Sequence, residues 1–368
     1  MTFQLQTKIK KNKNKPSSWM IIDLDHVFRR HYIGLKNYYI KNNSDKYTEQ
    51  YDWVSNFNFI NELSKQIKNK ITNLVAVNKY IQPNHVILTN ELIQPDNLEC
   101  GWRKNIFPDW NKKINQSDHV WGNIYDTYFK KFINERGYIY FQYQNTETND
   151  IIATVVKIIE NEFTCDYITI ISQDSDFYQL INDKITVLNI NGEEETSRIL
   201  PSGEINLWYK IINGQQSNNV PSLKFNYNFI KKFLKDDYDD NLETSLYREL
   251  TKKELYLVLH NLNDFKNLIE ESQDTVENNQ LYINQKIIDF NFIPSKIAND
   301  IAKSFWYEYN KTINIFNDQS STSFLESVSK SSLGMTETSK KINKTNSNNI
   351  FSILDVDVDE NDSNESED

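Results

Sequence analysis

Acidic side chains follow three short apolar runs of the sequence. The runs cover residues 19–22, 138–141 and 167–171. The acids that follow them are Asp23 with Asp25, Glu147 with Asp150, and Asp174 with Asp176. Hard cations such as Mg²⁺ bind carboxylate oxygens, and two such ions about 4 Å apart activate a water and stabilise the leaving oxygen in phosphodiester hydrolysis. If the acids converge, the pattern predicts that chemistry. Taken singly, each acid would also serve as a helix cap or a solvated loop residue.

The apolar runs are typical of buried parallel strands. We expect strands at 19–23, 85–88, 138–141, 167–171 and 185–188. Apolar residues at helical spacing predict helices at 53–80, 119–136 and 148–162. Strands that alternate with helices indicate an α/β fold with a mostly parallel sheet flanked by helices. Because sites in such sheets form at the carboxyl ends of the strands, the acids fall where a site is expected.

The rest of the chain has a different organisation. Residues 228–310 have helical spacing and no convincing strand. We therefore expect five segments: a basic flexible N-terminus at 1–17, the α/β domain at 18–225, a helical C-terminal domain at 226–316, a disordered linker at 317–349, and an apolar patch with an acidic tail at 350–368.

Composition excludes several classes of protein. Of the 368 residues, 38% are hydrophobic and 25% are charged. The hydrophobic share is enough to form a buried core. Two cysteines, Cys100 and Cys165, cannot form a cysteine-based zinc site or a disulfide framework. No apolar run is long enough to span a membrane, and no apolar segment follows the basic N-terminus. An intracellular protein is expected, and the richness in Asn, Ile, Lys and Tyr is typical of an AT-rich genome such as a viral one.

Six motifs, in chain order, resemble those of the 5′-nuclease family, which includes flap endonucleases and phage 5′–3′ exonucleases. They are Asp23 with a trailing Arg30, a W-R-R-like segment at 101–104, E-x-D-D-h-I-A (h is apolar) at 147–153, S-x-D-x-D-F-x-Q-L at 172–180, G-D-x-x-D-N at 235–241, and L-I-D-F-D-x-I-P at 287–294. The last motif is similar to that of the T-even phage ribonuclease H type. The resemblance covers roughly residues 18–310.

The resemblance implies a PIN-like α/β domain, a helical arch and a C-terminal helical part that binds duplex. It implies two Mg²⁺ ions, with Mn²⁺ as a substitute. The first ion or its waters would be surrounded by Asp23, Glu147, Asp150, Asp174 and Asp176, and the second would be served by Asp237 and Asp240. Arg103 and Lys104 would stabilise charge near the scissile phosphate.

Further cations are candidates for contacts with nucleic-acid phosphates, although exposed helical lysines are usually only solvated. These candidates are Arg30, Lys112, Lys113, Lys231 and Lys232. The implied substrate is DNA or an RNA–DNA hybrid with a 5′ end or flap. A monomer is expected, and the patch at 350–354 on its acidic tether would dock a sliding clamp or a single-strand-binding protein, or would merely be solvated.

The sequence departs from the family pattern in four places. Asn90 stands where the second strand would end in a metal-binding Asp, with Glu91 one residue further on. Asn149 replaces the middle acid of E-x-D-D, and Asp236 replaces the Gly of G-D-x-x-D-N. Residues 241–290 contain no Gly, although the family commonly has a Gly-rich duplex-binding turn there. Amides attract a cation less than carboxylates, so metal affinity or rate is expected to fall.

The sequence is compatible with three hypotheses about function. The leading hypothesis is a metal-dependent 5′–3′ exonuclease or flap endonuclease of replication or repair. The runner-up is a structure-specific nucleic-acid-binding protein of the same fold that has lost cleavage through Asn90 and Asn149. A PIN-type endoribonuclease is third, because such domains end before a motif like 235–241.

Overall fold

The computed structural model describes residues 17–78, 81–92, 101–110, 124–144, 146–194, 200–234, 247–271 and 278–318. The predicted basic N-terminus, nearly all of the linker and the acidic tail lie outside these residues. No helix in the described part of the chain is long and apolar enough to cross a membrane.

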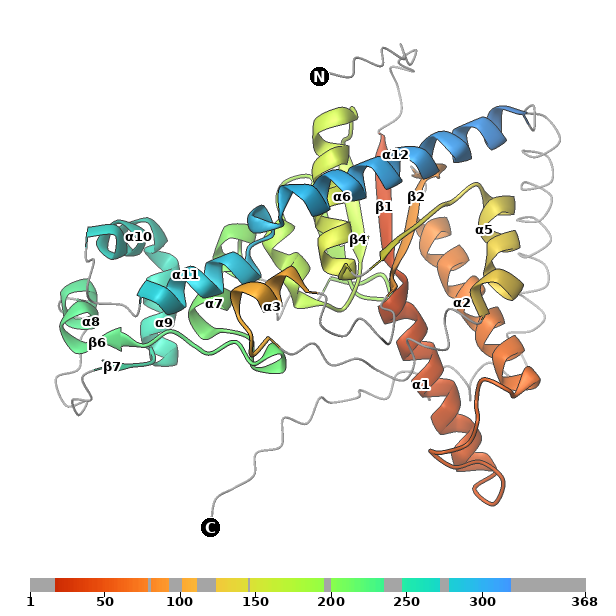
Figure 1. Cartoon of the computed structure of the whole chain (residues 1–368), viewed down its shortest axis with the longest axis horizontal. Helices are drawn as coiled ribbons and strands as arrows, with labels where there is room; N and C mark the ends of the chain where they lie inside the picture. Colours follow the sequence, from red (N-terminus) through yellow and green to blue (C-terminus); the bar gives the residue numbers. More distant parts are fainter. Residues whose placement is uncertain are drawn as a thin grey trace.

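A five-stranded parallel sheet forms the centre of the α/β part (Figure 1). Its strand order is β3-β2-β1-β4-β5. β2 and β3 are therefore added on one side of β1, and β4 and β5 on the other, so the strand order reverses between β1 and β4. The strands are β1 (Ser18–Asp23), β2 (Ile81–Leu92), β3 (Ile139–Gln144), β4 (Tyr167–Ile171) and β5 (Ile185–Leu188). All five predicted strands are present, and the predicted α/β fold is confirmed.

The alternation of side chains along β1 divides the core between the two faces of the sheet. Met20 and Ile22 join one cluster, whereas Trp19 and Ile21 join the other. Every residue of β1 is buried, as expected for a central strand covered on both faces. The apolar run therefore marks the middle of the domain.

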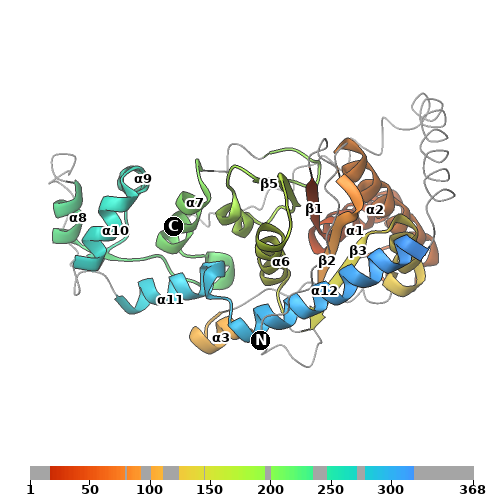
Figure 2. The ribbon, with the colours of Figure 1, turned by 90° about the horizontal axis from the view of Figure 1, so that it is seen from above.

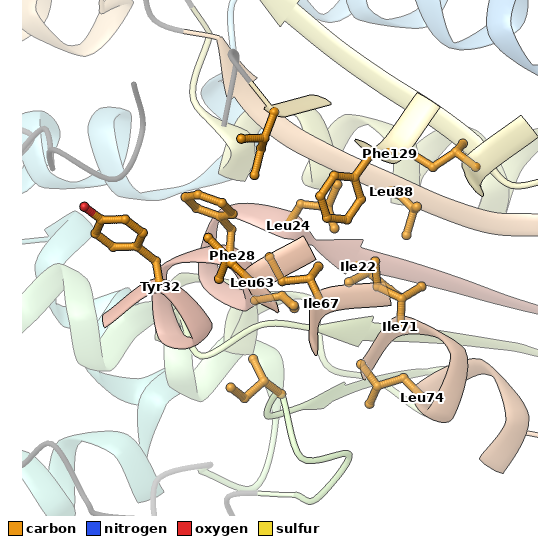
Figure 3. Packing of buried hydrophobic residues seen from close by; sticks show 14 of the residues in the cluster. Ile22, Leu24, Phe28, Tyr32, Leu63, Ile67, Ile71, Leu74, Leu88 and Phe129 are labelled. Atoms are coloured by element: carbon orange, nitrogen blue, oxygen red, sulfur yellow. The ribbon is translucent and has the colours of Figure 1, made fainter. Parts of the chain in front are cut away.

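One face of the sheet is covered by helices close to it in sequence, with the π-helical turn η2 leading into α5. Figure 3 shows Phe28, Leu63 and Phe129 from these elements around Ile22 and Leu88 of the sheet. The elements are α1 (Leu24–Asn42), α2 (Phe57–Val77), η2 (Tyr125–Phe129) and α5 (Lys130–Arg136).

The other face is covered by two helices that are far apart in sequence. They are α6 (Thr148–Glu162) and α12 (Ser295–Asp318). Figures 1 and 2 show α12 crossing this face of the sheet beside α6. The C-terminal part of the chain thus returns to cover the sheet of the α/β part.

A third cluster lies at the end of the molecule away from α1 and α2 (Figure 1). Its apolar residues come from several helices and pack around Trp208 and Phe265. These elements are α7 (Gly203–Asn213), β6 (Phe225–Asn226), α8 (Tyr227–Leu234), β7 (Tyr247–Arg248), α9 (Lys252–His260), α10 (Leu262–Glu271) and α11 (Asn278–Ile288).

The expectation of helices alone in this part needs one correction. Phe225 and Asn226 pair antiparallel with Arg248 and Tyr247. A two-residue ladder is too short to show strand alternation in a sequence, so it escaped prediction. Because α7 packs against both the 3₁₀ turn η3 (Ser175–Leu180) and α11, it joins the two parts, and the boundary at 225/226 stays a prediction.

Candidate active site

The acids gather where the strand order of the sheet reverses. Asp23 ends β1, and Asp174 follows β4 at the start of the 3₁₀ turn η3 (Ser175–Leu180). In open parallel sheets, this switch point between β1 and β4 leaves a crevice at the carboxyl ends of the strands. Both acids also cap the helical turn that follows, because Asp23 accepts from the backbone N–H groups of Asp25 and His26, and Asp174 accepts from that of Asp176. The cap interpretation is confirmed for both acids, and their predicted role as metal ligands stays a prediction.

Asp23 is almost completely enclosed, with 1% of its surface exposed. Its Oδ2 accepts from Ser172 Oγ at 2.8 Å and lies 2.7 Å from His26 Nδ1. Burial disfavours its charged form, but His26 and Ser172 hold the pKa of Asp23 below its usual value. Conversely, although burial would lower it, Asp23 raises the pKa of His26 to about 9. His26 is therefore a cation at neutral pH.

Ser172 links the acids of β1 to those after β4. Its Oγ donates to Asp23 and accepts from the backbone N–H of Asp174 at 3.1 Å. Asn149 continues the chain of contacts, because its Nδ2 donates to Asp174 Oδ2 at 2.9 Å and to Asp176 Oδ2 at 3.1 Å. The predicted departure at Asn149 thus lies inside the acidic cluster, where it holds two carboxylates together.

Asp176 also accepts from residues beyond η3. Lys210 Nζ and Gln215 Nε2 both contact its Oδ1. The Lys210 and Asp176 side chains are 14% and 16% exposed, so their ion pair is partly shielded from water. Counting Asn149, three side chains donate to this one carboxylate.

Arg103 lies in a buried ion pair. Its Nη1 and Nη2 donate to the two oxygens of Asp150 at 2.9 and 2.7 Å, and Nη1 lies 3.3 Å from Glu147 Oε1. Trp102 Nε1 donates to the same Asp150 at 2.7 Å. Burial would lower the pKa of Arg103, but Asp150 and Glu147 raise it above its ordinary value. This Arg positions two predicted metal-site acids, and its predicted role at the scissile phosphate stays a prediction.

Asn90 lies inside β2, two residues before its end, and its side-chain amide is hydrogen-bonded within the sheet. Asn90 is 1% exposed, and its Oδ1 accepts from Tyr140 Oη at 2.6 Å. Tyr140 also lies 2.8 Å from Gln142 Oε1. An Asp at this position would have to be buried as a charge, whereas the amide needs only hydrogen-bond partners.

The remaining predicted cations are not gathered at the cluster by any described contact. Lys104 follows Arg103 on α3 (Trp102–Ile106) and is half-buried. Arg30 lies on α1, and Lys231 with Lys232 lies on α8. Four predicted site residues lie outside the described part of the chain: Lys112, Lys113, Asp237 and Asp240.

Sequence reasoning missed four side chains that complete the cluster. They are His26, Ser172, Lys210 and Gln215. Ser172 stands in the quoted motif at 172–180, and His26 lies one helical turn after Asp23, so both had a weak local signal. Lys210 and Gln215 had none, because they lie 34 and 39 residues from Asp176.

The donor chemistry of the cluster fits a hard divalent cation, because its carboxylates and amides offer oxygen. Within the described residues, however, no group of three or more His, Cys, Asp or Glu side chains is arranged to hold a metal ion. Protein donors already engage Asp23, Asp174 and Asp176. A metal ion here has to exchange with those donors.

The fold and its two family matches define a nuclease that acts on phosphodiester bonds. The family model of the 5′–3′ exonuclease N-terminal resolvase-like domain matches residues 18–205, about half of the chain. The chain therefore belongs to the 5′–3′ exonuclease family, as its motifs predicted. The model of the T4 RNase H C-terminal domain matches residues 201–316. A comparison with curated proteins found no match.

Solved structures that are similar to this chain include three of phage T5 proteins. The D15 protein co-crystallised with metal ions is 14% identical, with a TM-score of 0.45 and coverage of 79% of this chain and 99% of that one. The D15 flap endonuclease in a pseudo-enzyme-product complex with DNA and metal ions is 15% identical, with a TM-score of 0.44 and coverage of 81% and 98%. A mutant of the T5 5′-exonuclease is 15% identical, with a TM-score of 0.41 and coverage of 80% and 100%.

Proposed function

We propose that this protein is a divalent-metal-dependent 5′–3′ exonuclease or flap endonuclease. Its substrates are DNA or RNA–DNA duplex structures with a 5′ end or flap, as arise in replication or repair. The observation that carries the proposal is the linkage of Asp23, Asp174 and Asp176 through Ser172 and Asn149 at the switch point of the sheet. The membership in the 5′–3′ exonuclease family supports it.

Asp23, Asp174 and Asp176 would hold the ion, with Glu147 and Asp150 nearby for its waters. Bound Mg²⁺, or Mn²⁺ in its place, supplies activation of a water and stabilisation of charge on the phosphate. The chain itself supplies the framework. His26 keeps Asp23 ionised, and Arg103 fixes the position of Asp150 at the start of α6. Before the ion could bind, Asp174 and Asp176 would have to exchange the donors Asn149, Lys210 and Gln215 for it.

The second candidate, a binding protein without cleavage, is favoured by one set of observations. Amides stand at Asn90 and Asn149, and Lys210 forms an ion pair with Asp176. The two functions share a fold and a substrate, so only a cleavage assay separates them. A PIN-type endoribonuclease is disfavoured, because the match to the T4 RNase H C-terminal domain continues to residue 316.

The test is cleavage of a 5′-flap duplex and of an RNA-primed duplex, with Mg²⁺, Mn²⁺ or chelator. The double variant Asp174→Asn/Asp176→Asn removes two charges with little change of shape, and Asp264→Asn on the exposed side of α10 is the matched control. We expect metal-dependent cleavage by the wild type and the control, and none by the double variant. Tight binding with no cleavage in either metal would instead establish the binding protein.

A further inference from the structure

The run of residues directly after α7, which includes the 3₁₀ turn η4 (Gln216–Asn218), repeats the pattern G-D-x-x-D-N with both acids changed. The run is 214–219, with Gly214 and Asn219 at its ends. Gln215 and Asn218 stand at the two acidic positions. The segment 235–241 instead has both acids but lacks the leading Gly.

The geometry of Gly214 shows why this run needs its glycine. Its φ is +67°, in the left-handed region that side chains avoid. A Cβ there would lie 2.3 Å from the carbonyl oxygen of Val220. The chain folds back tightly at this point, because Gln215 and Val220 exchange backbone hydrogen bonds at 2.9 Å in both directions.

This tight turn places the side-chain amides of Gln215 and Asn218 beside the acidic cluster. Gln215 Nε2 donates to Asp176 Oδ1, and Asn218 Nδ2 lies 3.3 Å from Gln215 Oε1. The two changed positions therefore form a single hydrogen-bonded chain that ends on a carboxylate of the cluster. Ligands of a second ion beside Asp176 would come from these two positions.

A positive charge already occupies that place. Lys210, in the last turn of α7, directs its ammonium to the same Asp176 oxygen that Gln215 contacts. Because Gln215 and Asn218 stand at the two acidic positions of the pattern, two negative charges are absent. The ammonium of Lys210 balances the charge of Asp176. A divalent ion beside Asp176 would meet an ammonium and two amide groups.

We infer that Lys210, Gln215 and Asn218 replace the second metal site, so that this chain holds a single divalent ion. In this assignment the counterpart of G-D-x-x-D-N is 214–219, and Asp237 and Asp240 are not metal ligands. The inference rests on the proposed function in taking the remaining ion to bind near Asp23 and Asp174. It makes Lys210 a permanent substitute for the charge of the second ion.

The experiment counts Mn²⁺ ions bound by the full chain without nucleic acid, from the electron paramagnetic resonance signal of free Mn²⁺. We expect one ion for the wild type and one for Asp237→Asn/Asp240→Asn. The variant Lys210→Met/Gln215→Asp/Asn218→Asp restores two carboxylates and removes the ammonium, so it should gain an ion. A wild type with two ions that loses one in Asp237→Asn/Asp240→Asn overturns the inference.

Two further measurements keep the test decisive. Lys210→Met alone removes a competing cation and should tighten Mn²⁺ binding at least about fivefold, whereas unchanged affinity would show that Lys210 is only structural. If the wild type binds no Mn²⁺ and cleaves nothing, the proposed function fails. The inference is then still tested by the triple variant, which should bind one Mn²⁺ ion more than the wild type. A triple variant that keeps the wild-type melting profile but gains no ion contradicts it.

Discussion

The Nε of Arg103 donates to the backbone carbonyl of Ile287 at 2.7 Å, across 184 residues of sequence. Ile287 belongs to the last turn of α11, whose final carbonyls have no partner within the helix. The negative end of the helix dipole also favours a cation there. The same guanidinium pairs with Asp150 at the start of α6. One side chain thus joins the C-terminal helices to the acidic cluster.

Replacing Arg103 by Ala should strongly destabilise the protein, because it leaves the buried Asp150 without its cation. Removing one partner of a buried pair costs about 3–5 kcal/mol. Urea unfolding would measure the loss, with Arg29→Ala on the exposed side of α1 as the control, expected within about 0.5 kcal/mol of wild type. The double variant Arg103→Ala/Asp150→Asn should lose less than the sum of the single losses, and strict additivity would contradict the coupling.

Gln179 should also stabilise the contact between the acidic cluster and the C-terminal helices, by less than Arg103 does. Its Nε2 donates to the carbonyls of Asp176 and Ile288 at 3.0 and 3.1 Å, and its Oε1 accepts from Phe290 N at 3.1 Å. Gln179→Ala leaves buried groups without partners, so we expect a loss of about 1–3 kcal/mol in thermal or urea unfolding. Gln179→Glu keeps only the acceptor and adds charge beside Asp176, and a Glu variant as stable as the wild type would refute this role.

Gly203 should not tolerate a side chain. A Cβ on it would lie 2.4 Å from the carbonyl oxygen of Gln179 and 2.7 Å from that of Ile181, both backbone atoms. Gly203→Ala should therefore cost about 1–3 kcal/mol of unfolding free energy. Gly101→Ala is the matched control, because its nearest neighbour would be 3.9 Å away, and it should change stability by less than about 0.5 kcal/mol. Equal effects of the two substitutions would rule out the steric explanation.

The stability of the fold should decline in mild acid because of His31. Burial lowers the pKa of His31 from 6.5 to about 4, although its Nδ1 donates to the carbonyl of Val27 at 2.7 Å. The unfolded chain therefore binds a proton first as the pH falls. This contribution to the free energy of unfolding is complete above pH 6.5 and decreases towards pH 4, by up to about 3 kcal/mol.

The pH effect is isolated by comparison with His31→Gln. Urea unfolding of both proteins at several pH values between 4 and 7 should give a smaller slope for the variant, since Gln does not titrate. Other acids titrate in both proteins and cancel in the difference. Identical slopes would show that His31 is protonated equally in the folded and unfolded states.

The family resemblance could be predicted because its motifs are short and local. The strand at 167–171 and the acids after it lie within ten residues of each other, so the sequence displays both. The same holds for Asp23 at the end of β1 and for the helical spacing of α6. The pairing of β6 with β7 could not be predicted, because two paired residues leave no periodic pattern.

The sequence by itself determined the order of strands and helices, the position of the acids at strand ends and the membership in a nuclease family. These properties depend on the spacing of residues along a few helical turns or one strand. Only the tertiary structure decided which groups face those acids. Arg103 is buried against Asp150 and α11, and Gln215 reaches Asp176 through the turn at Gly214. Contacts between such distant residues depend on how whole helices pack, which no local pattern encodes.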